Sequence, residues 1–207
     1  MLTEGAVLLT LRDTEVRLDI EETGSTFREN ALLKAATWAA FLAADECHMA
    51  AEWVLADDSG LEVDALNGAP GVHSARFAGL DTGVSGNSPD RENNAKLLRL
   101  LEAVPIERRT GRFRCALSLV PILRGGSPGE MAARARFFEG SCEGRLGFAP
   151  QGGAGFGYDP LFFPEGFNQS FAELGAEIKN QISHRSRALA QLRPFLASLP
   201  SGKNSSG

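Results

Sequence analysis

The stretch "VLADDSGLEVDALNGAPGVHSARFAG", residues 54–79, decides how we expect this chain to fold. Its apolar start predicts a buried strand over 53–57, and the alternation in "LEVDAL" predicts a half-exposed strand over 61–66. The first strand ends in two adjacent acids, Asp57 and Asp58. Because successive side chains of a strand point to opposite faces, only one of the two carboxylates is expected to face a given ligand.

The acidic pair has a chemical interpretation and a structural one. A carboxylate beside a buried strand can hold a magnesium ion and polarise a water molecule, particularly when a second carboxylate approaches it. Glu21 and Glu22, in "EETGSTF", are the candidates for that second group. Alternatively, "DDSG" is only a turn, because Asp, Ser and Gly are favoured in turns. Both interpretations stay open at this point.

Patterns on either side of this stretch predict alternating helices and strands. A helix is expected over 25–45, because Thr26 and Glu29 have the spacing of a capping box and apolar residues recur at helical period. A second helix is expected after Ser88 and Pro89. The other predicted elements are strands at 6–11, 16–20, 112–123 and 133–144 and a last helix at 183–199, capped by Ser183. This mixture is typical of an α/β or α+β sheet protein.

Length and charge narrow the class of protein. The 207 residues, 43% of them hydrophobic, predict one domain at 1–197, followed by a disordered tail at 198–207. The formal net charge of -5 argues against binding to duplex nucleic acid, because that affinity comes from lysine and arginine on phosphates. A small anion held at one place is compatible with this charge.

The cysteines and the apolar runs predict a soluble protein of the reducing cytoplasm. Cys47, Cys115 and Cys142 are widely spaced and form no CxxC pair, so neither a zinc site nor a disulfide framework is expected. No apolar run approaches the roughly 20 residues of a membrane span, and the start of the chain lacks the pattern of a signal peptide.

Two groups of residues could contact a nucleotide. Asn30 and Lys34 lie four apart on one helix face and could present an amide and an ammonium to phosphate oxygens, with a solvated helix flank as the alternative. The second group is "GGAGFGYDPLFF", residues 152–163, which is not a GxGxxG motif followed by a helix. Its glycines allow close approach, and Phe156 and Tyr158 offer rings for stacking; a flexible hairpin loop is the alternative.

A third group of donors surrounds the start of the last predicted helix. Lys179, His184 and Arg185 gather there, and the free backbone N–H groups of a helix start also favour an anion or an acceptor. Such donors could read a keto oxygen on a base. A purely structural histidine is the alternative interpretation.

Four motifs together closely resemble the inosine triphosphate pyrophosphatase family, also called dITP/XTP pyrophosphatases. They occur in register between about residue 8 and residue 197, as "EETGSTFRENALLKA" (21–35), "ADDSGLEVDALNGAPGVHSARFAG" (56–79), "GFGYDPLFF" (155–163) and "AELGAEIKNQISHRSRAL" (172–189). The resemblance implies an elongated α/β fold with a mixed β-sheet, flanking helices and two lobes around a nucleotide cleft. It also implies a homodimer and magnesium-dependent hydrolysis of dITP, ITP and XTP to the monophosphate and pyrophosphate, which removes deaminated purines from the nucleotide pool.

The resemblance also implies roles for single residues. Asp58 matches the catalytic acid and metal ligand, Glu22 the second metal carboxylate, and Ser59 a substrate contact. The residues that match the loop around the base and the neighbouring substrate contacts are Phe156, Gly157, Tyr158, Asp159, Lys179, His184 and Arg185. Asp57 is then expected to face the opposite side of the strand.

The chain departs from the family pattern at its start. Members usually begin with a buried strand and an N-x-x-K turn that holds the triphosphate, whereas "MLTEGAVLLTLRD" resembles the segment that follows the first helix. We therefore expect the first strand and the phosphate-binding loop to be missing here. Two hypotheses follow: an active pyrophosphatase, or a non-catalytic nucleotide-binding remnant of the same fold.

Overall fold

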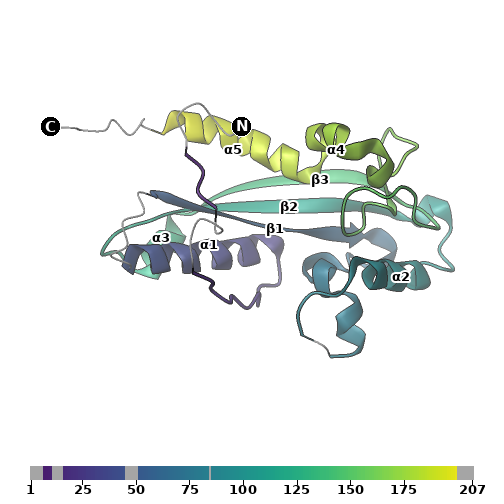
Figure 1. Cartoon of the computed structure of the whole chain (residues 1–207), viewed down its shortest axis with the longest axis horizontal. Coiled ribbons are helices and arrows are strands. Elements are labelled where there is room, and N and C mark those ends of the chain that lie inside the picture. The colour runs from purple at the N-terminus through teal and green to yellow at the C-terminus, as the bar shows by residue number, and fades with distance from the viewer. Residues whose placement is uncertain (1–6, 11–15, 45–50, 84, 200–207) are drawn as a thin grey trace.

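The architecture is a long antiparallel sheet with helices on both faces (Figure 1). A computed structural model describes residues 7–10, 16–44, 51–83 and 85–199. Within these residues the sheet has the strand order β1 (Trp53–Val63), β2 (Thr110–Pro121), β3 (Arg136–Leu146) and β4 (Phe162–Pro164), each antiparallel to the next.

Helices cover the two faces of the sheet. α1 (Phe27–Ala44) packs on β1 and β2 from one face, and α5 (His184–Ser198) packs on β2 and β3 from the other. α2 (Asp90–Leu100) and α3 (Pro128–Ala133) lie on the side of α1, whereas α4 (Phe171–Ile182) lies on the side of α5 (Figure 1). Short 3₁₀ helices connect these elements: η2 (Asp64–Leu66), η3 (Gly71–Arg76), η4 (Ala78–Asp81) and η5 (Ile106–Arg108). The predicted α/β class with flanking helices is confirmed, whereas the strands that the structure describes pair antiparallel throughout and not as the mixed sheet that the resemblance implied.

The strands predicted at 53–57 and 61–66 form one continuous strand, β1, which ends at Val63. Residues 64–66 of the second predicted strand form the 3₁₀ helix η2 instead. The alternative of a turn at "DDSG" is wrong. Ser59 and Gly60 lie inside the strand and pair with Cys115 and Arg114 of β2. Gly60 is required for packing, since a Cβ there would lie 2.5 Å from Ser74 Oγ and 2.7 Å from Phe27 Cε1. Gly60, a residue type that favours turns, therefore serves here to let η3 and α1 approach the strand.

The sheet is buried on both faces, which explains the long apolar run in β2. Cys115, Leu117 and Leu119 pack with residues of α5 in one core cluster. Ala116 and Val120, which alternate with them, belong to the clusters formed with α1. Burial on both sides replaces the polar alternation of a half-exposed strand with continuous hydrophobicity.

The predicted helix starts are confirmed. Thr26 Oγ1 accepts from Glu29 N at 3.1 Å, and Glu29 Oε2 accepts from Thr26 N at 3.1 Å, so the two residues form the expected capping box. Ser183 caps α5, with its side chain accepting from Ser186 N. These caps fix where α1 and α5 begin, and both starts belong to the site described below.

Other predictions differ from the structure. Residues 7–10 and 16–20 belong to no helix or strand, so the strands predicted there are wrong over the described residues. The rest of the predicted strand 6–11 lies outside the described residues. α4 was not predicted, although Ser170 and Glu173 form a capping box at its start. The helix α5 ends at Ser198, and residues 200–207 of the predicted tail lie outside the described part of the chain.

Within the described ranges, no helix is both long enough and apolar enough to cross a membrane.

Gly140 on β3 permits the close approach of α5, and we expect Gly140→Ala to destabilise the fold. A Cβ at this position would collide with the His184 carbonyl oxygen and lie 2.7 Å from Ala188 N, both in the α5 backbone. Overpacking of this kind lowers the free energy of unfolding by about 1–3 kcal/mol. Urea unfolding measures the loss. Gly129→Ala is the control, because no atom lies within 4 Å of its added Cβ, and equal stability of the two variants would contradict this account.

Candidate functional site

Asp57 and Asp58 point to opposite faces of β1, as the alternation of a strand predicts. Asp58 contacts Lys34 and Asn30 of α1 on one face. Asp57 contacts Arg185 of α5 on the other. One strand therefore carries two clusters of charged residues, one on each side of the sheet.

The Asp58 cluster is a network of ion pairs on the α1 side. Asp58 is only 8% exposed, and its two carboxylate oxygens accept from Lys34 Nζ at 3.0 Å and from Asn30 Nδ2 at 3.2 Å. The same Lys34 Nζ donates to Glu22 Oε1 at 2.7 Å, and Arg76 Nη1 lies 3.3 Å from Glu22 Oε2. A single ammonium therefore lies within hydrogen-bond distance of two carboxylates.

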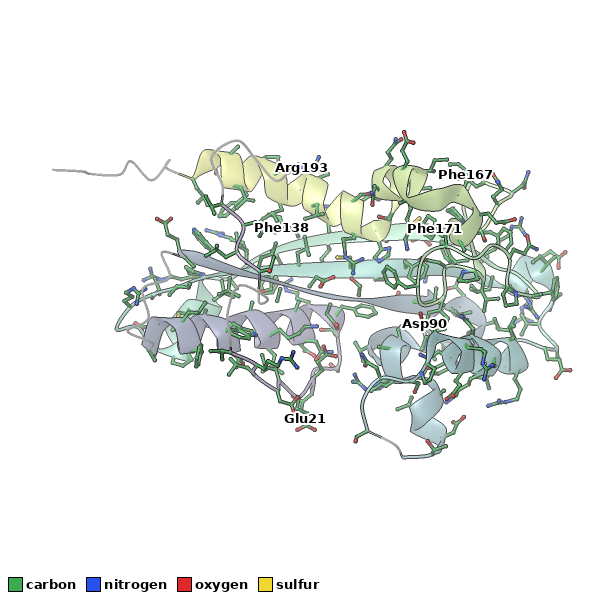
Figure 2. The ribbon with its side chains drawn as sticks, viewed as in Figure 1. Glu21, Asp90, Phe138, Phe167, Phe171 and Arg193 are labelled. Atoms are coloured by element: carbon green, nitrogen blue, oxygen red, sulfur yellow. The ribbon has the colours of Figure 1, made fainter. Side chains whose placement is uncertain are left out.

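Of the two candidates for the second carboxylate, the structure brings Glu22 to the cluster. Asn30 Oδ1 accepts from Gly24 N at 2.7 Å, which ties the segment before α1 to the first turns of the helix. Lys34 lies one helical turn further on the same face and reaches Glu22. Glu21 is exposed and lies at the outer edge of the molecule (Figure 2).

The environment moves the pKa values of these groups in different directions. Burial raises the pKa of Asp58 above its ordinary value, although the charge and hydrogen bond of Lys34 oppose the shift. Burial also acts on Glu22, but there the donors Lys34 and Arg76 outweigh it and lower the pKa. The pKa values of the two carboxylates are thus shifted in opposite directions.

The arrangement fits a magnesium ion that is held partly by a substrate. The described residues contain no group of three or more His, Cys, Asp or Glu side chains that could hold a metal ion by themselves. Glu22 and Asp58 nevertheless both reach one cation, the Lys34 ammonium. Magnesium typically uses one or two protein carboxylates, with waters and substrate phosphates filling its other positions, so these two residues would hold it.

The Asp57 cluster opens onto a cavity of about 580 Å³ between α4, α5 and the glycine-rich loop. Asp57 Oδ2 accepts from Arg185 Nη2 at 2.8 Å and from Arg185 Nε at 3.2 Å, and Ser59 Oγ lies 3.3 Å from the same oxygen. Arg185 lines the cavity, so Asp57 orients one of its donors. Ser59 shares the Asp57 face and not that of Asp58.

An aromatic ring and an ammonium line the same cavity. Phe156 is 62% exposed, and Lys179 Nζ lies 4.4 Å from its ring centroid. Asp159 is buried; it accepts from the Lys179 ammonium and, at 3.0 Å, from Phe156 N. Phe171 on α4 and Arg193 on α5 also line the cavity and lie on the same side of the sheet (Figure 2).

His184 lines the cavity as a neutral ring. It is 5% exposed and stacks on Phe113 with 4.9 Å between the ring centroids. Burial, together with the positive charges of Arg185 and Lys179, lowers the pKa of His184 to about 3. Among the residues described, no group hydrogen-bonds its buried Nδ1 atom.

Two residues of the predicted base loop bind other parts of the protein and do not line the cavity of about 580 Å³. The Tyr158 ring is buried, and its hydroxyl donates to Ser74 O at 2.9 Å. The Gly157 backbone bonds to α2. Sequence reasoning missed Arg76 and Phe171; Arg76 lies within the quoted stretch 54–79, but only the fold brings it to Glu22.

The chain belongs to the Ham1 family, whose sequence profile matches residues 1–195. It is 48% identical over 178 residues to a dITP/XTP pyrophosphatase of Desulforamulus reducens, covering 86% of this chain and 77% of that relative. A dITP/XTP pyrophosphatase of Geobacillus kaustophilus is 44% identical over 208 residues, covering 97% of this chain and 91% of that relative. The resemblance seen in the sequence is confirmed.

Solved structures agree with this assignment. The HAM1 protein of Coxiella burnetii superposes with a TM-score of 0.72 at 37% identity, covering 91% of this chain and 90% of that one. The Ham1 protein of Staphylococcus aureus gives a TM-score of 0.70 at 39% identity, covering 87% of this chain and 81% of that one. The fold is therefore shared with this family.

The buried neutral His184 predicts a loss of stability in acid. Its folded-state pKa lies at about 3, below the ordinary value of 6.5, so the unfolded chain takes up a proton that the folded chain does not. This contribution is absent above pH 6.5 and destabilises increasingly as the pH falls toward 3, by at most about 1.4 kcal/mol per pH unit.

Urea unfolding of the parent protein and of His184→Gln between pH 7 and pH 4 tests this prediction. The variant should lose less stability than the parent as the pH falls, because it carries no titrating group at this position. Parallel pH dependences for the two proteins would contradict the buried neutral state.

Proposed function

We propose that this protein hydrolyses deaminated purine nucleoside triphosphates, dITP, ITP and XTP, to the monophosphate and pyrophosphate. One observation carries the proposal: a single strand has a cluster of carboxylates and cations on one face, and on its other face lies a cavity lined by an exposed ring and four cationic or imidazole side chains. The names of the relatives support this substrate class. The intact carboxylate pair and this relationship favour an enzyme over the non-catalytic remnant. From the same relationship we propose a cytoplasmic homodimer.

At the phosphate end, Asn30, Lys34 and Arg76 supply donors to phosphate oxygens. When bound, magnesium would be held by Glu22 and Asp58, neutralising phosphate charge and activating water. The raised pKa of Asp58 suits it to take a proton from the attacking water as the anhydride bond between the α- and β-phosphates breaks. Lys34, released from the carboxylates, is free to pair with the departing pyrophosphate.

At the base end, the cavity offers stacking and donors. The exposed Phe156 ring provides a face for a purine, while Lys179 and Arg185 donate at the rim. Hypoxanthine and xanthine carry a keto oxygen at position 6, which accepts from such donors, whereas adenine carries an amino group there. A donor that meets an amino group stays unpaired, which penalises adenine. Guanine also has the keto group, so its exclusion must act on its 2-amino group.

The opposite orientations of the two aspartates predict different kinetic defects. Asp58→Asn removes the basic carboxylate, so kcat for pyrophosphate release from dITP with magnesium should fall by about 10²–10⁴-fold with an intact fold. Asp57→Asn weakens the hold on Arg185, so its main effect should be a raised KM. The two variants control for each other, since they are isosteric and adjacent. Parental turnover by Asp58→Asn would refute the assignment.

Base selection can be tested with two substrates that differ only in the base. Because dITP and dATP share the sugar and the triphosphate, the ratio of their kcat/KM values measures base discrimination alone. We expect dITP to be preferred on the order of 10²-fold or more, since unpaired donors penalise adenine. Equal kcat/KM values would show that the donors of the cavity do not read position 6.

A further inference from the structure

The glycine-rich loop at 152–157 separates two cavities. The cavity of about 580 Å³ lies on its α4 and α5 side, and a second cavity of about 400 Å³ lies on its α2 side. Ala154, Gly155 and Phe156 line both. The loop lies between α2 and α4 in Figure 1. On the side of the larger cavity, Asp159 holds the loop by accepting from Phe156 N at 3.0 Å, and Lys179 Nζ lies 4.4 Å from the centroid of the Phe156 ring.

Hydrogen bonds from α2 hold the end of the loop at Gly157. Gly157 N donates to Asp90 Oδ2 at 2.6 Å, and Gly157 O accepts from Asn94 Nδ2 at 2.9 Å. Asp90 and Asn94 are four residues apart and share one face of the helix. Gly157 has φ of +61°, a left-handed conformation that other residues rarely adopt. Both polar groups of one loop residue are thus bound by one helix.

α2 is itself anchored, so it can serve as a fixed support. Asn93 Oδ1 accepts from Ala78 N at 2.8 Å, and Asn93 Nδ2 donates to Ala75 O at 3.1 Å. Lys96 Nζ donates to Phe77 O at 2.8 Å and to Asp81 Oδ1 at 2.7 Å. These bonds tie the helix to η3 and η4 and do not involve the loop.

The stability of the fold does not by itself explain Asn94, because one of its polar atoms is buried without a hydrogen-bond partner among the described residues. It is buried, and no described residue hydrogen-bonds its Oδ1 atom. An unpaired buried acceptor opposes folding, so the bond from Nδ2 to Gly157 is the contact that explains an amide at this position. Asp90, labelled in Figure 2, is exposed and makes the complementary bond from the first residue of the helix.

We propose that Asp90 and Asn94 are positioning residues that set the Phe156 ring for stacking on the base. The inference rests on the proposed function. Phe156 directly precedes Gly157, so the bonds of Gly157 to α2 act on the Phe156 backbone in addition to the contacts that Asp159 and Lys179 make with Phe156. Neither Asp90 nor Asn94 lines the larger cavity as the described residues define it. They act through the Phe156–Gly157 peptide and determine substrate affinity more than the chemical step.

Steady-state hydrolysis of dITP by Asp90→Ala and Asn94→Ala tests the proposal. Loss of a well-placed stacking ring should raise KM about tenfold, with kcat within about threefold of the parent. Asp90→Asn keeps an oxygen acceptor for Gly157 N and should restore a nearly parental KM. Hydrogen exchange at the Phe156 and Gly157 amides, measured without nucleotide, should be faster in both alanine variants.

Asn93→Ala is the matched control, since it removes the neighbouring buried amide that binds η3 and η4 instead of the loop. It should lower the melting temperature without raising KM. Should Asn93→Ala fail to fold, Arg91→Ala replaces it, as Arg91 is an exposed residue of the same helix. An unchanged KM in Asp90→Ala and Asn94→Ala, with an active parent, overturns the inference alone. Absence of dITP turnover by the parent counts against the proposed function, and the inference falls with it.

Discussion

The site depends on the alternation of side chains along β1, which sends two adjacent carboxylates to opposite faces of one sheet. Asp58 meets Lys34 on the α1 face, and Asp57 meets Arg185 on the α5 face. Like charges on neighbouring residues would repel if they shared a face. Separation by the strand gives each acid its own cation and lets one backbone segment position two clusters.

The cluster around Asp58 depends on a positive charge that two carboxylates share. Two carboxylates share the Lys34 ammonium, and the pKa of Lys34 is raised because Glu22 and Asp58 outweigh the opposing effect of burial. A buried carboxylate without a cation is costly, so the lysine stabilises the pair when no metal is bound. A divalent ion held by Glu22 and Asp58 would take the place of this ammonium between the two carboxylates.

Local sequence patterns predicted most of the helices and strands. The features that they did not predict depend on contacts between residues that are distant in sequence. The capping box at Thr26 and Glu29, the apolar period of α1 and the alternation at Asp57 were readable because each depends on residues a few positions apart. "DDSG" suggested a turn, but contacts with Ser74 and Phe27, distant in sequence, require a glycine in the strand. The bonds from Asp90 and Asn94 to Gly157 span more than 60 residues, so no local pattern could reveal them.

Under the proposed function, the residues for base recognition and for hydrolysis are positioned by the same short segment of β1. Arg185 is oriented by Asp57, and the reacting group is the next residue, Asp58. A base that fits the cavity therefore fixes the position of its triphosphate relative to the Asp58 carboxylate. Misplacement of a reacting group by about 1 Å can cost on the order of 10²-fold in rate. The continuous pairing of β1 with β2 keeps this spacing fixed, because Asp57 and Asp58 lie opposite Leu117 and Ala116 in an unbroken register. A break in the strand at this point would uncouple the two faces, which gives a physical reason for a strand where the composition suggests a turn.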